Sequence, residues 1–240
     1  MIRALLFDYG STLDGADHWL DRYLGYYQAA GVEIAREQLD FAYTAATRAG
    51  YHARDTLECA NLTRLNWFLV GKQIDFLRSA EAPPQVRSQM EELGMNGRTM
   101  MRVRIVEAMV DESTRAMAAS RAILERLAPR FKLGVVSNFY GNLETVLEEA
   151  GIRMMLAAVV DSSRVGSFKP DPRIFSLALE GLGTSSAETA MIGDSLDKDI
   201  RPAAALGMRT AWYCPRETRV AGPDDVLRIR SLEELDSIEW

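Results

Sequence analysis

The hydrophobic and polar positions along this chain change their period twice. A short apolar run from Ala4 to Phe7 ends at Asp8 and a Gly-Ser-Thr turn, which predicts a buried strand that delivers a carboxylate to the end of a sheet. From about residue 16 to 110, apolar residues recur at three- and four-residue spacing, which is typical of amphipathic helices. From residue 113 onward, short apolar runs alternate with helical segments, which predicts a parallel sheet wrapped by helices.

The first helical stretch is expected to form a separate domain. Its periodicity predicts helices over residues 17–30, 35–49 and 56–77. Helical periodicity then continues to residue 110, and we expect Gly94 and Gly97 to interrupt it. Because no convincing strand occurs in this stretch, we expect residues 16–110 to form an all-helical cap inserted after the first strand, over the strand ends where ligand clefts open.

The remaining segments predict the sheet. Strands are expected over residues 132–136, 157–160, 189–192 and 210–213, with a weak strand over 226–229. The helices between them are expected over residues 113–127, 142–150, 173–181 and 198–206. Residues 1–15 and 111–240 should therefore form an α/β catalytic core, a Rossmann-like parallel sheet flanked by helices.

Polar residues stand at four predicted strand ends or in the loops that follow them. They are Asp8, the Ser137-Asn138 pair, Lys169, and Asp194 with Asp199. Each alone has an ordinary explanation as a turn residue, a helix cap or a solvated lysine. Since open α/β sheets build their sites at the carboxyl ends of strands, the set as a whole is a candidate site.

Composition narrows the classes of partner. The formal net charge is -6, which gives no general electrostatic reason to expect nucleic acid or an acidic membrane. The two cysteines, Cys59 and Cys214, lie far apart in no metal-binding motif, which argues against a disulfide framework or a structural zinc site. The N-terminal apolar run is too short for a signal peptide or a membrane span. We therefore expect a cytoplasmic protein.

The residues around the strand ends form four motifs. They are Phe-Asp8-Tyr-Gly-Ser-Thr12-Leu, Val-Val-Ser137-Asn138, Lys169-Pro-Asp-Pro-Arg-Ile-Phe and Ile-Gly-Asp194-Ser-Leu-Asp-Lys-Asp199-Ile. Together and in this order they resemble the haloacid dehalogenase-like superfamily of hydrolases, in its variant with a helical cap inserted after the first strand. The resemblance covers residues 1–15 and 113–213, and the cap matches only in position and helical character.

The resemblance implies hydrolysis of a small phosphorylated metabolite. Asp8 would attack phosphorus and form an aspartyl-phosphate, which divides a difficult hydrolysis into two easier steps. Lys169 would bring positive charge to Asp8 and the phosphate, and Ser137 would donate to a phosphate oxygen. Thr12 would orient the first loop. The further phosphate-binding groups would be Ser11, with the backbone amides of its turn, and Asn138.

The resemblance also implies a metal ion. Several carboxylates crowded with a phosphate require a counter-cation, and a hard, oxygen-seeking Mg²⁺ suits the ligand set. The ligands would be Asp8, Asp194 and the carbonyl of Gly10, with Asp199 acting through water or by holding Lys169. Thiolates that would select a softer metal are missing from these motifs.

One position departs from the pattern of the family's phosphatases. They carry a second Asp two residues after the nucleophile, where this chain has Gly10, and Ser11 stands where Gly is usual. A lost general acid/base costs about 10²–10⁴-fold in rate. The chain could therefore favour aryl or acyl phosphates, whose leaving groups need little protonation, or another group such as His18 could transfer the proton.

Other classes of function remain open at this point. The chain could be a catalytically weak member that binds a phosphorylated ligand or a protein partner. It could also be a dehalogenase, or cleave phosphonates through a Schiff base on Lys72, whose apolar neighbours in sequence would lower an amine pKa. Arg54 and Arg64 could meet an anionic substrate, and the cap could pair with a second copy to form a homodimer.

Overall fold

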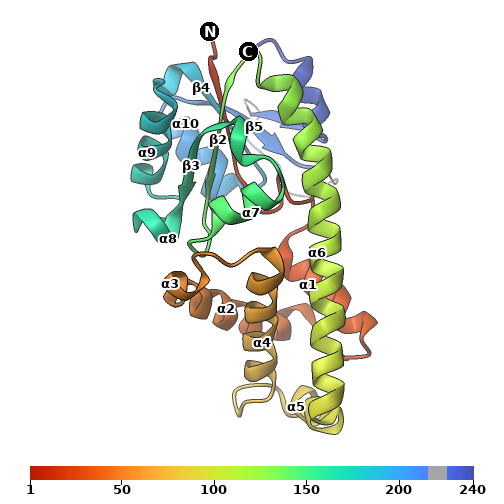
Figure 1. Ribbon diagram of the computed structural model, residues 1–240. Helices are drawn as coiled ribbons and strands as arrows, with labels where there is room; N and C mark the ends of the chain where they lie inside the picture. The colour runs from red at the N-terminus through yellow and green to blue at the C-terminus, as the bar shows by residue number, and fades with distance from the viewer. Residues whose placement is uncertain (216–225) are drawn as a thin grey trace. The chain divides into compact units, whose positions relative to one another are not determined.

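The chain folds into two compact units. The computed structural model describes residues 1–215 and 226–240, and Figure 1 shows its elements. One unit, here called the α/β unit, comprises Met1–Ala16 and Thr114–Trp240. The other, the helical unit, comprises Asp17–Ser113. Among the described residues, no helix is long and apolar enough to cross a membrane.

A six-stranded parallel sheet forms the centre of the α/β unit. The strand order is β3-β2-β1-β4-β5-β6, and every pair of neighbours is parallel. The predicted parallel sheet is confirmed, including its weak last strand. The strands are β1 (Ala4–Phe7), β2 (Lys132–Ser137), β3 (Leu156–Asp161), β4 (Thr189–Gly193), β5 (Arg209–Tyr213) and β6 (Leu227–Ile229).

Helices follow the strands and cover the sheet. α9 buries an apolar stripe that includes Ile174, Phe175 and Leu182 in one core with Leu6 and Val136 of the sheet, because its apolar residues recur at three- and four-residue spacing. The helices of this unit are α7 (Leu143–Glu149), α8 (Ser162–Val165), α9 (Pro172–Leu182) and α10 (Arg201–Ala205). Short helical turns are η1 (Arg153–Met155), η2 (Ser186–Glu188), η3 (Leu196–Ile200) and η4 (Leu232–Asp236).

The order of the strands reverses direction at β1. β1 lies between β2 and β4, with Phe7 level with Val135 on one side and Ile192 on the other. The chain moves outward to β3 from one side of β1 and returns to β4 on the other. Such a reversal opens a crevice at the carboxyl ends of the strands, and Asp8 is the first residue beyond β1.

The helical unit contains helices only, as its periodicity predicts. Tyr23, Tyr27, Leu39, Leu65 and Leu69 are among its fully buried side chains, and α2 packs on α4. The helices are α1 (Trp19–Ala29), α2 (Arg36–His52), α3 (Arg54–Leu57), α4 (Leu62–Leu77), α5 (Pro84–Glu92) and the first part of α6 (Gly94–Leu127).

Several predicted helix boundaries are wrong. The helix expected over residues 113–127 is the last part of α6 and does not begin separately. The helix expected over 56–77 is divided into α3 and α4, because the Asn61 side chain accepts a hydrogen bond from Arg64 N at 2.9 Å and begins a new helix. Gly97 does not interrupt α6, which runs unbroken for 34 residues; a helix tolerates an interior glycine at a cost of about 1 kcal/mol. The helix expected over 198–206 becomes η3 followed by α10, since Pro202 cannot donate within a regular helix.

Replacing glycine by alanine should change the free energy of unfolding in opposite directions at two positions. At Gly134 in β2, a Cβ would lie 3.1 Å from Leu6 Cδ1 and 3.2 Å from Leu182 Cδ2. We expect Gly134→Ala to lower the free energy of unfolding by about 1–3 kcal/mol, because these core side chains must move. At Gly25 in α1 a Cβ would meet nothing within 4 Å, so Gly25→Ala should raise it by about 0.5–1 kcal/mol. Urea denaturation followed by circular dichroism measures both; effects of the same sign would contradict this packing.

Candidate active site

A tight turn after β1 presents the Asp8 carboxylate. Asp8 N donates to Ile192 O at 2.9 Å, which fixes the end of β1 against β4. The backbone N–H groups of Thr12, Leu13 and Asp14 all donate to the carbonyl oxygen of Tyr9, and Leu13 N is the nearest of them at 2.8 Å. Ser11 has a φ of +60°, in the left-handed region, and its N–H donates to Asp14 Oδ1 at 2.8 Å. Asp14, which the sequence analysis did not single out, therefore stabilises the turn.

Three donors meet on one oxygen of Asp8. Tyr9 N donates to Oδ1 at 2.7 Å, Ser137 Oγ at 2.8 Å, and Lys169 Nζ lies 2.7 Å away. Among the described residues, every hydrogen bond or ion pair of this carboxylate reaches Oδ1. The other oxygen, Oδ2, therefore has no protein donor in that part of the chain and is available to bond to an electrophile.

Lys169 bridges two carboxylates in a buried position. Its Nζ lies 2.6 Å from Asp199 Oδ1 as well as 2.7 Å from Asp8 Oδ1. The Lys169 side chain is 2% exposed and that of Asp199 is 0% exposed. Burial alone would lower the pKa of Lys169, but the charges of Asp199 and Asp8 outweigh it and raise the pKa above its usual range. The amine is therefore held as an ammonium ion.

The Asn138 side chain fixes the backbone of Lys169. Its Oδ1 accepts from Lys169 N at 2.8 Å, and its Nδ2 donates to Lys169 O at 3.0 Å. The side-chain amide thus satisfies both backbone groups of one residue that is 31 positions away in sequence. Asn138 positions the lysine in this structure, a role that its place after the second strand did not indicate.

Asp194 and Asp199 are held by two hydrogen bonds and by the space that a glycine leaves. Trp212 Nε1, at the end of β5, donates to Asp194 O at 2.8 Å. Asp199 Oδ2 accepts from Ser195 N at 3.0 Å. A Cβ at Gly193 would lie 2.5 Å from Asp199 Oδ2, so only glycine lets this carboxylate approach the end of β4.

Three carboxylates in this site could hold a cation. Asp8, Asp194 and Asp199 each offer an oxygen within 4.8 Å of the others. Burial, followed by the charges of Asp8 and Asp199, raises the pKa of Asp194 to about 8. Burial also raises the pKa of Asp199 to about 6, against the opposing ion pair with Lys169. Three ionised carboxylates and one ammonium leave a formal charge of -2, so the set fits a divalent cation with a preference for oxygen ligands.

The other predicted site residues in the α/β unit lie in the first turn. Thr12 is buried, and its Oγ1 has no hydrogen-bond partner among the described residues. Gly10 is half-buried, and a Cβ added there would meet no atom within 4 Å. The missing side chain at Gly10 is therefore not imposed by a lack of space.

The candidate residues of the helical unit have local contacts of their own. His18 is the N-cap of α1, and its Nδ1 accepts from Leu20 N at 3.2 Å. The Lys72 side chain is 45% exposed and lies 3.8 Å from Asp75 Oδ2, so the apolar setting inferred from its neighbours in sequence is wrong. Arg54 is 52% exposed and lies 3.8 Å from Asp55 Oδ1.

Besides Asp14, sequence reasoning missed two further residues that support the site. Trp212 was assigned only to a strand, because its contact with Asp194 depends on the pairing of β4 with β5. Asp161, at the end of β3, accepts from Gly141 N, Leu143 N and Ser163 N at 2.8–3.1 Å and so fixes the loop after β2. Its position after a predicted strand was the one available indication.

Comparison with known proteins identifies relatives of this chain. A sequence model of haloacid dehalogenase-like hydrolases matches residues 2–207. Haloacid dehalogenase-like hydrolase domain-containing protein 3 from Bos taurus is 43% identical over 93 residues, 39% of this chain and 34% of that protein. Phosphoserine phosphatase from Thermus thermophilus is 39% identical over 89 residues, 36% of this chain and 35% of that enzyme. The matches thus span about a third of these relatives.

The likeness to solved structures extends over almost the whole chain. A haloacid dehalogenase-type hydrolase from Bacillus subtilis, solved in a magnesium-bound form, aligns with a TM-score of 0.56 and 18% identity. The alignment covers 98% of this chain and 97% of the other. At this level of identity the likeness concerns the fold.

The raised pKa of Asp194 predicts how the metal-free protein responds to pH. Between about pH 4 and pH 8 the folded protein binds more protons at Asp194 than the unfolded chain, so its free energy of unfolding should fall as pH rises. Asp194→Asn removes this contribution, and the variant should lose less stability across that window. Thermal denaturation in chelator measures the effect. Asp197→Asn, at a 78% exposed side chain, is the control; parallel curves for all three proteins would contradict the prediction.

Proposed function

The chain belongs to the haloacid dehalogenase-like hydrolase family, and on this basis we propose that it hydrolyses small phosphorylated metabolites through a phosphorylated Asp8. The observation that carries the proposal is the asymmetry of the Asp8 carboxylate, with three donors on Oδ1 and none on Oδ2 among the described residues. The presence of a phosphoserine phosphatase among the relatives supports this class of substrate. The chemistry is assigned to the α/β unit.

Asp8 Oδ2 is the attacking atom in this proposal. It forms a bond to phosphorus while the bond from phosphorus to the leaving oxygen breaks, and that oxygen departs with the electron pair. Water then attacks the aspartyl-phosphate, which releases inorganic phosphate and restores the carboxylate. The donors on Oδ1 fix the orientation of the carboxylate in both steps, so the reacting oxygen needs no rearrangement before attack.

Lys169 and Ser137 serve the transferring phosphoryl group. The buried ammonium of Lys169 stays charged and neutralises negative charge beside Asp8. The Ser137 hydroxyl, now donating to Asp8 Oδ1, can rotate to donate to a phosphate oxygen. Asn138 keeps Lys169 in place through two backbone hydrogen bonds, and Ser11 and Thr12 lie in the turn that follows Asp8.

We also propose Mg²⁺ as the cofactor. Asp8, Asp194 and Asp199, with the carbonyl of Gly10, would hold it. When bound, the ion supplies positive charge that offsets the phosphate and the crowded carboxylates. Asp199 has a second task in the structure, since it holds Lys169.

Gly10 restricts the leaving groups that the site can handle. No carboxyl group stands two residues after Asp8 to protonate a departing alkoxide. Aryl and acyl phosphates depart as weaker bases and depend less on a proton donor. We therefore propose that such phosphates are the better substrates.

The first experiment tests Asp8 itself. Asp8→Asn should abolish phosphate release in the presence of Mg²⁺, because an amide is a poor nucleophile. Beryllium fluoride with Mg²⁺ should raise the melting temperature of the parent protein but not of Asp8→Asn. Asp197→Asn, an exposed carboxylate nearby in sequence, should behave like the parent. Phosphatase activity that survives in Asp8→Asn would overturn the assignment of the nucleophile.

The second experiment tests the role of Gly10. The parent protein should turn over an aryl phosphate faster than an alkyl phosphate, and Gly10→Asp should raise kcat on the alkyl phosphate by about tenfold or more. The added side chain meets no atom within 4 Å of its Cβ, so the fold should accept it. Gly10→Asn is the matched control without an acid and should give no gain. Equal parent rates on both substrates would count against the proposal.

A further inference from the structure

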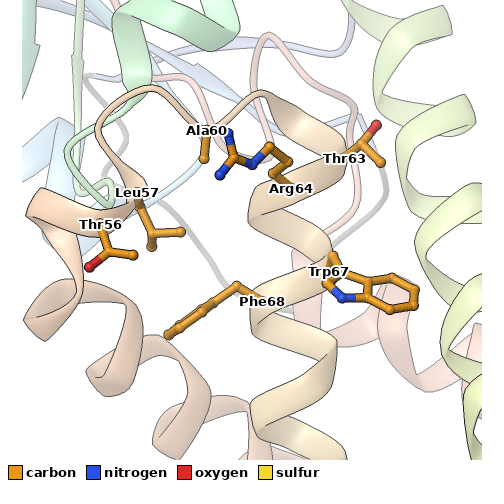
Figure 2. Close-up of a pocket in the computed structure, with 7 residues that line it drawn as sticks. All are labelled: Thr56, Leu57, Ala60, Thr63, Arg64, Trp67 and Phe68. Carbon is orange, nitrogen blue, oxygen red and sulfur yellow. The ribbon is translucent and has the colours of Figure 1, made fainter.

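The helical unit contains a pocket formed by α3, the loop that follows it, and α4. Its volume is about 310 Å³, which is at the lower end of the range for small-molecule sites. Figure 2 shows the side chains that line it. They are Thr56, Leu57, Ala60, Thr63, Arg64, Trp67 and Phe68. All seven belong to the helical unit, so the pocket is complete within it.

The lining of the pocket is mostly apolar, with one charged side chain and two threonines. Leu57 and Ala60 are buried and form its floor, and Phe68 is half-buried. Figure 2 places the Arg64 guanidinium beside Ala60, with the Phe68 ring directed from α4 toward the α3 side. Thr56 and Thr63 add two hydroxyl groups. A cation beside apolar surface suits a ligand that has both an apolar part and an anionic part.

Some arginines of the helical unit have side-chain partners, whereas Arg64 has none among the described residues. Arg22 pairs with Glu112 at 2.9 Å, Arg36 pairs with Asp21 at 2.5 Å, and Arg102 stacks on Trp67 at 3.9 Å. Within residues 1–215 and 226–240, the Arg64 guanidinium makes no hydrogen bond or ion pair; the backbone N–H of Arg64 donates to Asn61 Oδ1. The five N–H donors of this group are therefore available to a ligand.

The helix dipole adds to the positive potential around Arg64. This residue stands in the first turn of α4, a helix of 16 residues, where the helix dipole also favours an anion. The planar guanidinium can bind a carboxylate through two parallel hydrogen bonds. The charge and the apolar floor together define one class of occupant.

We propose that this pocket binds a small organic carboxylate, with its apolar ring system against Leu57, Ala60 and Phe68 and its carboxylate paired with Arg64. The inference goes beyond the hydrolysis proposed for Asp8 and does not depend on it, because every contact that it uses lies in the helical unit. A pocket of this volume accommodates a body of one or two fused rings.

The test uses 4-fluoro-1-naphthoate as the probe and the full chain as the protein. A ¹⁹F NMR titration should give a Kd of about 1 mM or tighter, the affinity expected for a ligand of this size. The neutral analogue 4-fluoro-1-naphthalenemethanol, which has the same rings, should bind about tenfold more weakly, because it cannot pair with the guanidinium.

Three variants locate the interaction. Arg64→Gln should weaken naphthoate binding by about tenfold and leave the neutral analogue unchanged. Arg64→Lys should recover part of the loss, because an ammonium keeps the charge without the planar fork. Arg48→Gln, at an exposed arginine of α2, makes the same change in net charge and should bind like the parent.

The outcomes separate this proposal from the one for Asp8. Naphthoate should bind Asp8→Asn with the parent affinity, whether or not that variant has lost phosphatase activity. Equal affinity of the parent and Arg64→Gln, equal losses in Arg64→Gln and Arg48→Gln, or no binding at millimolar probe would each overturn the pocket assignment.

Discussion

The ion pairs of Lys169 are the interaction on which the rest of the candidate site depends. One ammonium, 2% exposed, contacts Asp8 and Asp199 at 2.7 and 2.6 Å, and so joins the loop between α8 and α9 to the end of β1 and to η3. Removing one partner of a buried pair costs about 3–5 kcal/mol, since it leaves a charge without compensation. Asn138 fixes the lysine backbone and Gly193 leaves room for Asp199. Asn138 and Gly193 therefore both help to position the ion pairs of Lys169.

The same bridge does not balance the charge around it. Asp194 lies within 4.8 Å of Asp8 and Asp199, and burial with these two neighbours raises its pKa to about 8. The fold holds these groups together although they repel one another, which is a cost in stability that natural sites accept where function requires it. The geometry of these groups is therefore that of a site with capacity for further positive charge.

Much of the fold could be predicted from the sequence, because strand and helix periods depend on local spacing of apolar residues. The β1 strand, its carboxylate and the later strand ends are visible in this way. Contacts between residues far apart in sequence are not: the Asn138 amide on the Lys169 backbone and the Trp212 indole on Asp194 O depend on which strands pair. The break between α3 and α4 was missed because the Asn61 cap is a local hydrogen bond rather than a change of period.

The open space at Gly10 bears on which mutations the first loop can accept. Because a Cβ there touches nothing within 4 Å, packing does not oppose a carboxylate at this position, and the glycine codons that end in a pyrimidine become aspartate codons by one base change. A gene that uses such a codon at Gly10 is one base change from encoding two acids in the first loop. The packing around this position thus leaves both glycine and a residue with a side chain accessible to the fold.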